Sequence, residues 1–151
     1  MNKGWRTLLI LAVMCAACSG SRPSNLGVTD GTLAPCPDSP NCVSSQSKDT
    51  KHYIAPIPYE GDLIEARGAL IAVIEAMKRS RIVTHEATYI HAEFTSAVFR
   101  FVDDVEFSFD DAAKTIQVRS ASRVGYSDFG VNRTRMETIR RAFAASADVK
   151  E

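Results

Sequence analysis

Several features are scarce in this chain of 151 residues, and each scarcity excludes a class of protein. Four cysteines are too few for a miniprotein built on disulfides. The 18 basic residues equal the 18 acidic residues, so no positive charge excess favours nucleic-acid binding. The longest apolar run, Leu8–Ala17, reaches only about half of a hydrocarbon core as a helix. The 45% apolar content nevertheless supports one folded domain.

The beginning of the chain has the order of a lipoprotein signal. Lys3 and Arg6 precede the apolar run and small residues follow it, which predicts a secretory signal peptide over residues 1–17. The Cys-Ala-Ala-Cys sequence that ends at Cys18 resembles a bacterial lipobox, so we predict lipidation of Cys18. A plain signal peptide cut at a nearby small residue is the alternative. Ser19 is not the aspartate associated with inner-membrane retention, which favours an outer-membrane location facing the periplasm.

The residues after the signal predict a connecting segment and one domain. Residues 18–35 hold the lipidated cysteine and then a stretch rich in Ser, Gly and Pro without an apolar period, which indicates a flexible tether. We expect the globular domain over residues 36–145 and a short tail over residues 146–151.

A proline-rich loop between two cysteines opens the domain. Cys36 and Cys42 lie six positions apart, and in the oxidising compartment of an exported chain they are most simply a disulfide. A metal site completed by His52, His85 or His91, or a redox pair, is the alternative. Zinc and redox sites usually space their cysteines more closely, so we expect no bound metal and no cofactor.

Hydrophobic periodicity predicts an α+β domain in the order helix, four-stranded antiparallel sheet and C-terminal helix, with both helices on one face. The first helix follows Asp62 as its cap and has Leu63, Ile64, Leu70, Ile71, Ile74 and Met77 on one apolar face. Strand patterns occupy Ile82–Val83, Thr88–Thr95, Ala97–Phe109 and Thr115–Ala121. The last helix covers Thr134–Ala145, is capped by Thr134 or Asn132, and buries Met136, Ile139 and Phe143.

The last two strands are expected to pair as a hairpin. A turn signal follows Phe109, and placing Phe109 opposite Lys114 sets Phe107 opposite Ile116 and Asp104 opposite Arg119. Asp103 then has the parity of the apolar face, so either a bulge turns it outward or it is a buried acid with a partner.

Alternation in the second strand separates two sets of side chains. Ile90, Ala92 and Phe94 share one face, whereas Tyr89, His91 and Glu93 share the other. A solvated or lightly packed His91 is the expectation for that second face.

Residues 119–133 are dense in hydrogen-bonding side chains and join the last strand to the last helix. Glu86–Asp111 contains seven acids and one base, whereas Arg119–Arg141 contains six arginines and two acids. The hairpin would place these opposite charges side by side. The candidate ligand-binding residues of this segment are Arg119, Ser120, Ser122, Arg123, Tyr126, Asp128, Asn132 and Arg133.

Three interpretations of this segment remain open. Arg119 and Arg123 pair with Asp103, Asp104 or Asp128 as a structural latch. Alternatively, Arg123, Arg133 and the helix N-terminus receive a phosphate or carboxylate. The third interpretation is catalysis by Ser120, Ser122 or Asp128, although neither serine lies in a Gly-x-Ser-x-Gly elbow and no histidine within the segment activates it.

Three motifs together resemble one known family. They are Cys36–Ser45, Val102–Phe107 and Arg119–Arg133, and they are similar to the domain of unknown function 1499 over about residues 33–145. The resemblance implies a bacterial envelope protein, and it brings no established activity and no catalytic residue. We therefore expect a lipid-anchored, non-catalytic module that binds an envelope ligand or protein partner, with an envelope enzyme using residues 119–133 as the alternative.

Overall fold

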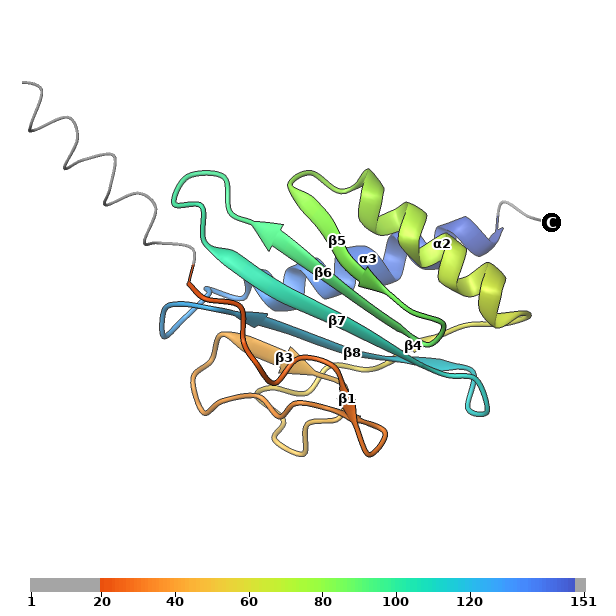
Figure 1. Ribbon diagram of the computed structural model, residues 1–151, viewed down its shortest axis with the longest axis horizontal. Coiled ribbons are helices and arrows are strands. Elements are labelled where there is room, and N and C mark those ends of the chain that lie inside the picture. The colour runs from red at the N-terminus through yellow and green to blue at the C-terminus, as the bar shows by residue number, and fades with distance from the viewer. Residues whose placement is uncertain (1–19, 149–151) are drawn as a thin grey trace, which may run out of the picture.

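The chain forms an antiparallel sheet with two helices on one face, as the computed structural model in Figure 1 shows. The structure describes residues 20–148, so the predicted signal peptide and Cys18 lie outside the described residues. The elements are β1 (Val28–Thr29), β2 (Thr32–Leu33), β3 (Cys42–Ser44), β4 (Ile57–Pro58), α2 (Leu63–Ala76), β5 (Ser80–His85), β6 (Tyr89–Thr95), β7 (Val102–Asp110), β8 (Thr115–Ser122) and α3 (Val131–Asp148). The predicted α+β class is confirmed.

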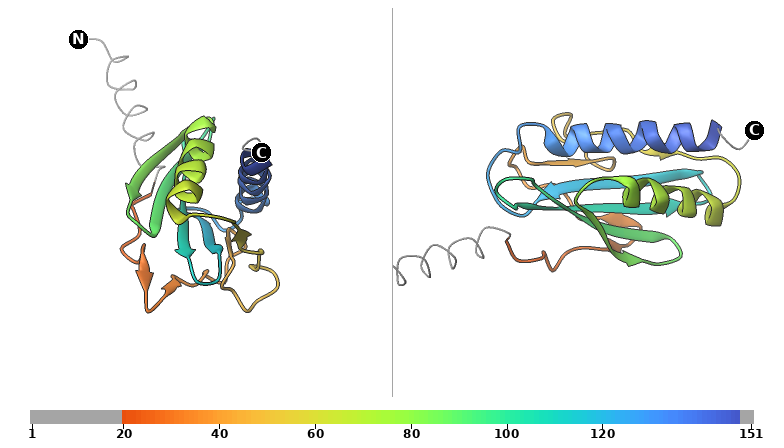
Figure 2. Two further views of the ribbon diagram at one scale, coloured as in Figure 1. Left: turned by 90° about the vertical axis from the view of Figure 1, so that its right-hand side faces the viewer. Right: turned by 90° about the horizontal axis from the view of Figure 1, so that it is seen from above.

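The main sheet has six strands where four were predicted. Its order is β3-β8-β7-β6-β5, and β4 also pairs with β8. β3 and β4 contain three and two residues, which is too short to show an alternating pattern. A separate pair, β1 and β2, lies with residues 20–33 on the side of the sheet away from the helices (Figure 2).

Helix α2 begins where the sequence predicts. The Asp62 carboxylate accepts hydrogen bonds from the backbone N–H groups of Ile64 and Glu65, at 2.6 and 3.3 Å. Leu70 and Ile74 are fully buried beneath the helix. Ile64 was predicted on the same apolar face but is 74% exposed, because Leu63 and Ala66 are the residues of the first turn that face the core.

Helix α3 is longer than predicted at both ends. It starts at Val131 because Asp128, rather than Thr134 or Asn132, accepts the backbone N–H of Asn132 and of Gly130, at 2.7 and 3.0 Å. The predicted buried stripe of Met136, Ile139 and Phe143 is confirmed.

The β7–β8 register differs from the predicted one by two residues. Phe107 pairs with Val118, and Arg119 lies opposite Glu106 rather than opposite Asp104. The strands continue to Asp110 and Thr115, and the turn between them places Lys114 in the left-handed region at φ 51°. A shift by two residues keeps every side chain on its face, so the apolar pattern cannot distinguish the two registers.

The strand predicted over Ala97–Phe109 starts later, at Val102. A turn precedes it, in which Ser96 N–H donates to the Phe101 carbonyl oxygen and Arg100 has φ 58°. Phe99 and Phe101, predicted on the apolar face, are therefore outside the strand and exposed.

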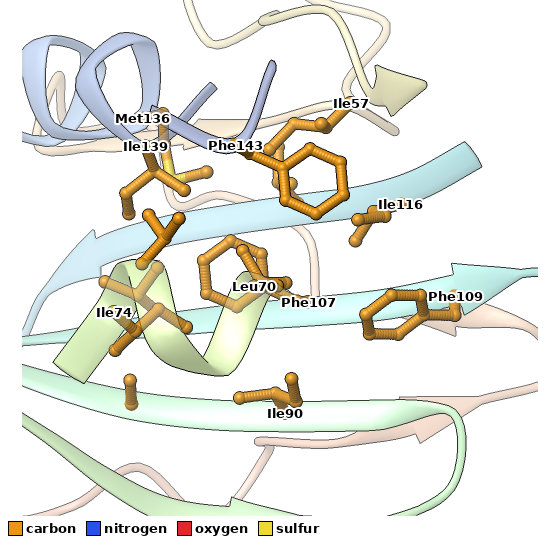
Figure 3. Packing of buried hydrophobic residues seen from close by; sticks show 14 of the residues in the cluster. Ile57, Leu70, Ile74, Ile90, Phe107, Phe109, Ile116, Met136, Ile139 and Phe143 are labelled. Atoms are coloured by element: carbon orange, nitrogen blue, oxygen red, sulfur yellow. The ribbon is translucent and has the colours of Figure 1, made fainter. Parts of the chain in front are cut away.

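One hydrophobic core lies between the sheet and the helices (Figure 3). Phe107, Ile90 and Ile116 of the sheet are completely buried against Leu70 of α2 and Ile139 of α3. This core occupies one face only, and the other face carries the polar residues described next.

Candidate functional site

The face of the sheet away from the helices is lined by buried charges. This surface, which we call the charged face, consists of Tyr89, His91 and Glu93 of β6, Asp104 and Glu106 of β7, Arg119 of β8, and Arg123 directly after β8. It follows from strand alternation, since the intervening residues belong to the apolar core. The expectation of a solvated His91 is wrong, because the N-terminal segment and neighbouring side chains cover it to 3% exposure.

Arg123 occupies the centre of one ion-pair cluster. Its Nε and Nη2 donate to the two carboxylate oxygens of Asp104, at 2.8 and 2.7 Å, and Nη2 also donates to Glu93, at 2.5 Å. His91 Nε2 donates to Asp104, at 2.8 Å. Burial acts to raise the pKa of Asp104, but the hydrogen bonds from Arg123 and His91 outweigh it and lower that pKa.

Glu93 is surrounded by three guanidinium groups. Arg22, Arg81 and Arg123 all donate to its carboxylate, at 2.6, 2.5 and 2.5 Å. Burial alone would raise the pKa of Glu93, but these arginines lower it to about 2. Glu93 is therefore an anion at neutral pH.

Glu106 forms a second cluster beside the first. Its Oε1 accepts from the Tyr89 hydroxyl and from the Gly27 backbone N–H, both at 2.8 Å, and its Oε2 accepts from Arg119, at 3.0 Å. Burial and the adjacent Glu106 carboxylate raise the pKa of Tyr89, so the phenol stays protonated. Arg119 Nε is the one buried side-chain nitrogen or oxygen among the described residues with no hydrogen-bond partner.

The segment predicted as a flexible tether contacts this face. Arg22 and Gly27 bond to Glu93 and Glu106, and Leu33 is buried, with its N–H donating to Gln46 at 2.8 Å. The sequence pattern showed none of these contacts, because the Arg22–Glu93 and Gly27–Glu106 bonds join residues 71 and 79 positions apart, and even Leu33 and Gln46 are 13 positions apart.

A cavity of about 740 Å³ lies between this segment and the sheet. Tyr89, His91 and Ser108 line its floor, and Arg22 and Gly27 line its outer side. Its carboxylates are Glu86, Asp110 and Asp111, against the single guanidinium of Arg22. The cavity is therefore polar and slightly acidic.

The helix side of β8 holds a separate polar group. Ser120 is fully buried and donates to the Asn132 side-chain oxygen at 2.5 Å, while Asn132 donates to Ser122 and to the Asn41 carbonyl oxygen, both at 3.0 Å. Arg135 donates to Ser120 as well as to Asp103. Asp103 is thus the buried acid with a partner, and no bulge turns it outward.

The remaining candidates lie at the surface or at the start of the helix. Tyr126 is exposed, and Asp128 caps α3. Arg133 donates to the carbonyl oxygens of Tyr53 and Lys51, at 2.8 and 2.9 Å. Arg123 and Arg133 consequently lie on opposite sides of the sheet, so they do not form one anion site.

The cysteine loop is closed by a disulfide. Cys36 and Cys42 are bonded, with their Cα atoms 5.6 Å apart, which leaves neither sulfur free for the alternative metal or redox site. His52 bonds to Asp49 and the Ser39 carbonyl oxygen, and His85 contacts Arg67. Within residues 20–148 no three His, Cys, Asp or Glu side chains form a group suited to a metal ion.

Four residues of the charged face were not among the predicted site residues: Tyr89, His91, Glu93 and Glu106. Two signals pointed toward them: the acidic block over Glu86–Asp111, and the shared parity of the polar residues in β6. The predicted meeting of acidic and basic blocks is confirmed. Arg123 pairs with Asp104, as the latch interpretation expected, whereas Arg119 pairs with Glu106.

Comparisons with known proteins identify the family and no activity. A search of curated proteins finds no match to the chain. The sequence profile of the family described as protein of unknown function (DUF1499) matches residues 32–143. This range contains the disulfide loop, the charged face of the sheet and most of α3. The resemblance expected from the three motifs is confirmed, and the chain belongs to the DUF1499 family.

Proposed function

We propose that this chain is a lipid-anchored protein of the cell envelope, attached to the outer membrane and facing the periplasm, whose domain binds a ligand or partner without catalysis. The basic, apolar and small-residue order that ends at Cys18 supports the anchor. Among residues 20–148, neither helix has the length and apolar character needed to cross a bilayer.

The observation that carries the non-catalytic role is the internal use of the candidate reactive groups. Ser120 and Ser122 hydrogen-bond with Asn132, and Asp128 holds the start of α3. A nucleophile or acid–base residue needs access to a substrate and a partner that takes its proton. These groups support a latch between β8 and α3.

The cavity under the N-terminal segment is the ligand site in this proposal. Its carboxylates outnumber its guanidinium groups, which disfavours an anion. Its hydroxyl, amide and imidazole groups suit a neutral, hydroxyl-bearing or cationic molecule of the envelope. Tyr89 and His91 are held rigidly by Glu106 and Asp104, so the floor is formed before any ligand enters.

The anchor is tested by mass spectrometry of the protein purified from membranes of a Gram-negative host. We expect a mature N-terminus at Cys18 that carries acyl chains, and we expect Cys18→Ser to move the protein into the soluble periplasmic fraction. An unmodified N-terminus on a soluble wild-type protein would contradict the anchor.

The cavity is tested by native mass spectrometry of the same membrane-purified protein. Ser108→Trp fills the cavity floor, whereas Ile64→Trp adds the same side chain on an exposed part of α2. A co-purifying mass that Ser108→Trp removes and Ile64→Trp retains would support the site. If the wild type has only the mass of the protein, the cavity is not a ligand site, and the domain would instead bind a protein partner.

The alternative is an envelope enzyme, and one observation favours it. His91 lines the cavity while Asp104 holds its Nε2, an arrangement that suits general acid–base catalysis. This would place the chemistry on the charged face rather than on residues 119–133. A mass change in envelope extract that the wild type produces and His91→Gln does not would establish it.

A further inference from the structure

Two loops expose large apolar side chains that no folding contact explains. The first, residues 96–101, carries Val98, Phe99 and Phe101. The second, residues 123–131, ends on the first residue of α3 and carries Tyr126, Phe129 and Val131. Phe129 is 96% exposed and Phe99 is 67% exposed. Phe99 and Phe101 stack on each other, with ring centroids 5.5 Å apart, and so form one small apolar surface. Exposed clusters of this kind mark binding surfaces.

Both loops extend from the same end of the sheet. Asp103 at the start of β7 pairs with Ser122 at the end of β8, and Arg123 N–H donates to the Val102 carbonyl oxygen at 3.1 Å. Figure 1 shows the two loops projecting together beyond the strands, at the end opposite the start of α2.

The described chain also begins at this end. Gly20 packs so closely against Arg123 and Val124 that a Cβ atom at Gly20 would lie 2.9 Å from each side chain. In Figure 1 the described chain begins at the same end of the sheet as the two loops. Cys18 precedes Gly20 by only two residues in the sequence, so an acyl chain on Cys18 would bring this end of the domain to the bilayer.

Basic side chains surround the apolar ones. Arg100 lies between Phe99 and Phe101, and Lys78 and Arg79 are exposed in the neighbouring turn, where Arg79 Nε donates to the Thr95 carbonyl oxygen at 3.2 Å. The one acid in the two loops, Asp128, is bonded to the start of α3. Aromatic rings with flanking cations suit the interface of a membrane that contains anionic lipids.

The backbone at Phe129 gives a second reason for a role outside the fold. Phe129 has φ 53°, in the left-handed region, where a bulky side chain is an outlier and glycine is usual. Neither its conformation nor a packing contact requires phenylalanine there. The side chain is instead held away from the domain, toward whatever lies beyond this end.

We propose that these two loops insert their aromatic side chains into the lipid interface next to the anchor, so that the domain stands on the membrane in one fixed orientation. This inference rests on the proposed attachment through Cys18. It places the charged face and its cavity at the side of the standing domain, open to molecules in the periplasm.

Tryptophan fluorescence in vesicles tests the orientation. In the mature lipoprotein, which begins at the acylated Cys18 and has lost Trp5 with the signal peptide, the variants Phe99→Trp, Phe129→Trp and Ile64→Trp each carry a single tryptophan at an exposed site. Each is reconstituted into vesicles of phosphatidylethanolamine and phosphatidylglycerol, with and without brominated acyl chains. We expect emission at shorter wavelength and strong quenching by bromine at positions 99 and 129, and neither at position 64.

The outcomes separate the loop insertion from the anchor. If the vesicles bind the protein but none of the three tryptophans is quenched, the anchor holds and the loop insertion is wrong. If positions 99, 129 and 64 are quenched equally, the domain has no fixed orientation and the inference is also wrong. If the protein does not bind the vesicles, the proposed anchor fails and the inference fails with it.

Discussion

At the scale of single residues, Arg123 neutralises more buried negative charge than Arg133 does. It lies between two buried carboxylates, and its own side chain is 8% exposed. Arg133 has the same chemistry in the same segment, but it lies at the surface and bonds only to backbone carbonyl oxygens. Replacing each arginine in turn therefore compares the loss of a buried ion pair with the loss of hydrogen bonds at the surface.

We expect Arg123→Ala to lower the free energy of unfolding by about 3 kcal/mol or more, because Asp104 and Glu93 would remain buried without their shared cation. Arg133→Ala should cost about 1 kcal/mol or less, since water replaces it at the surface. Urea unfolding followed by circular dichroism measures both. Equal small losses would show that Arg123 has no structural role.

The lowered pKa of Glu93 makes the stability of the folded domain depend on pH. Its folded pKa of about 2 lies below the usual 4.5, so its contribution is fully present above pH 4.5 and is lost as the pH falls toward about 2. Glu93→Gln should be less stable than the wild type at neutral pH, and the difference should shrink in acid. Unfolding curves across this range measure the difference, and a constant gap would contradict the ion-pair cluster.

At the scale of elements, the disulfide loop joins an edge of the sheet. Cys42 is the first residue of β3 and pairs with Ala121 of β8. Asn41, within the loop, accepts the Ser122 N–H through its backbone carbonyl and donates through its side chain to Gly125. The loop therefore supports both a short strand and the connection to α3.

Cys36→Ser combined with Cys42→Ser should lower the free energy of unfolding by about 2 kcal/mol, because the unfolded chain loses its closed loop. Thermal and urea unfolding of the oxidised protein measure this loss. A reductant should destabilise the wild type by a similar amount and leave the double variant unchanged. A reductant effect on the double variant would point to some other cause.

At the scale of the whole molecule, residues 20–33 close the charged face from outside. The Gly27 N–H reaches Glu106 at 2.8 Å, at a glycine with φ 105°. This segment forms the outer wall of the cavity. Its attachment to the sheet therefore controls access to Tyr89 and His91.

Gly27→Pro should loosen this segment without unfolding the domain. Proline has no N–H and cannot adopt φ 105°, while Glu106 would keep its bonds to Tyr89 and Arg119. We expect faster hydrogen exchange over residues 20–33 and unchanged exchange in β6–β8. Ser24→Ala is the control, and protection equal to the wild type would show that the Gly27 contact is dispensable.

Local pattern was sufficient for much of this protein and insufficient for the candidate site. The apolar period predicted both helices and the faces of β6, β7 and β8, and cysteine spacing with the exported context predicted the disulfide. The pattern missed β3 and β4, which are too short to show a period. It also could not choose between two hairpin registers with the same parity.

The sequence by itself determined the α+β class, the core residues of the two helices apart from Ile64, the meeting of an acidic and a basic block, and the family. Only the tertiary structure decided that Glu93 pairs with three arginines, that Asp104 holds His91 and Arg123, and that residues 20–33 cover these groups. The reason is physical: alternation and helical spacing follow from neighbours along the chain. An ion pair follows from which distant strands and loops the fold places within about 3 Å of each other.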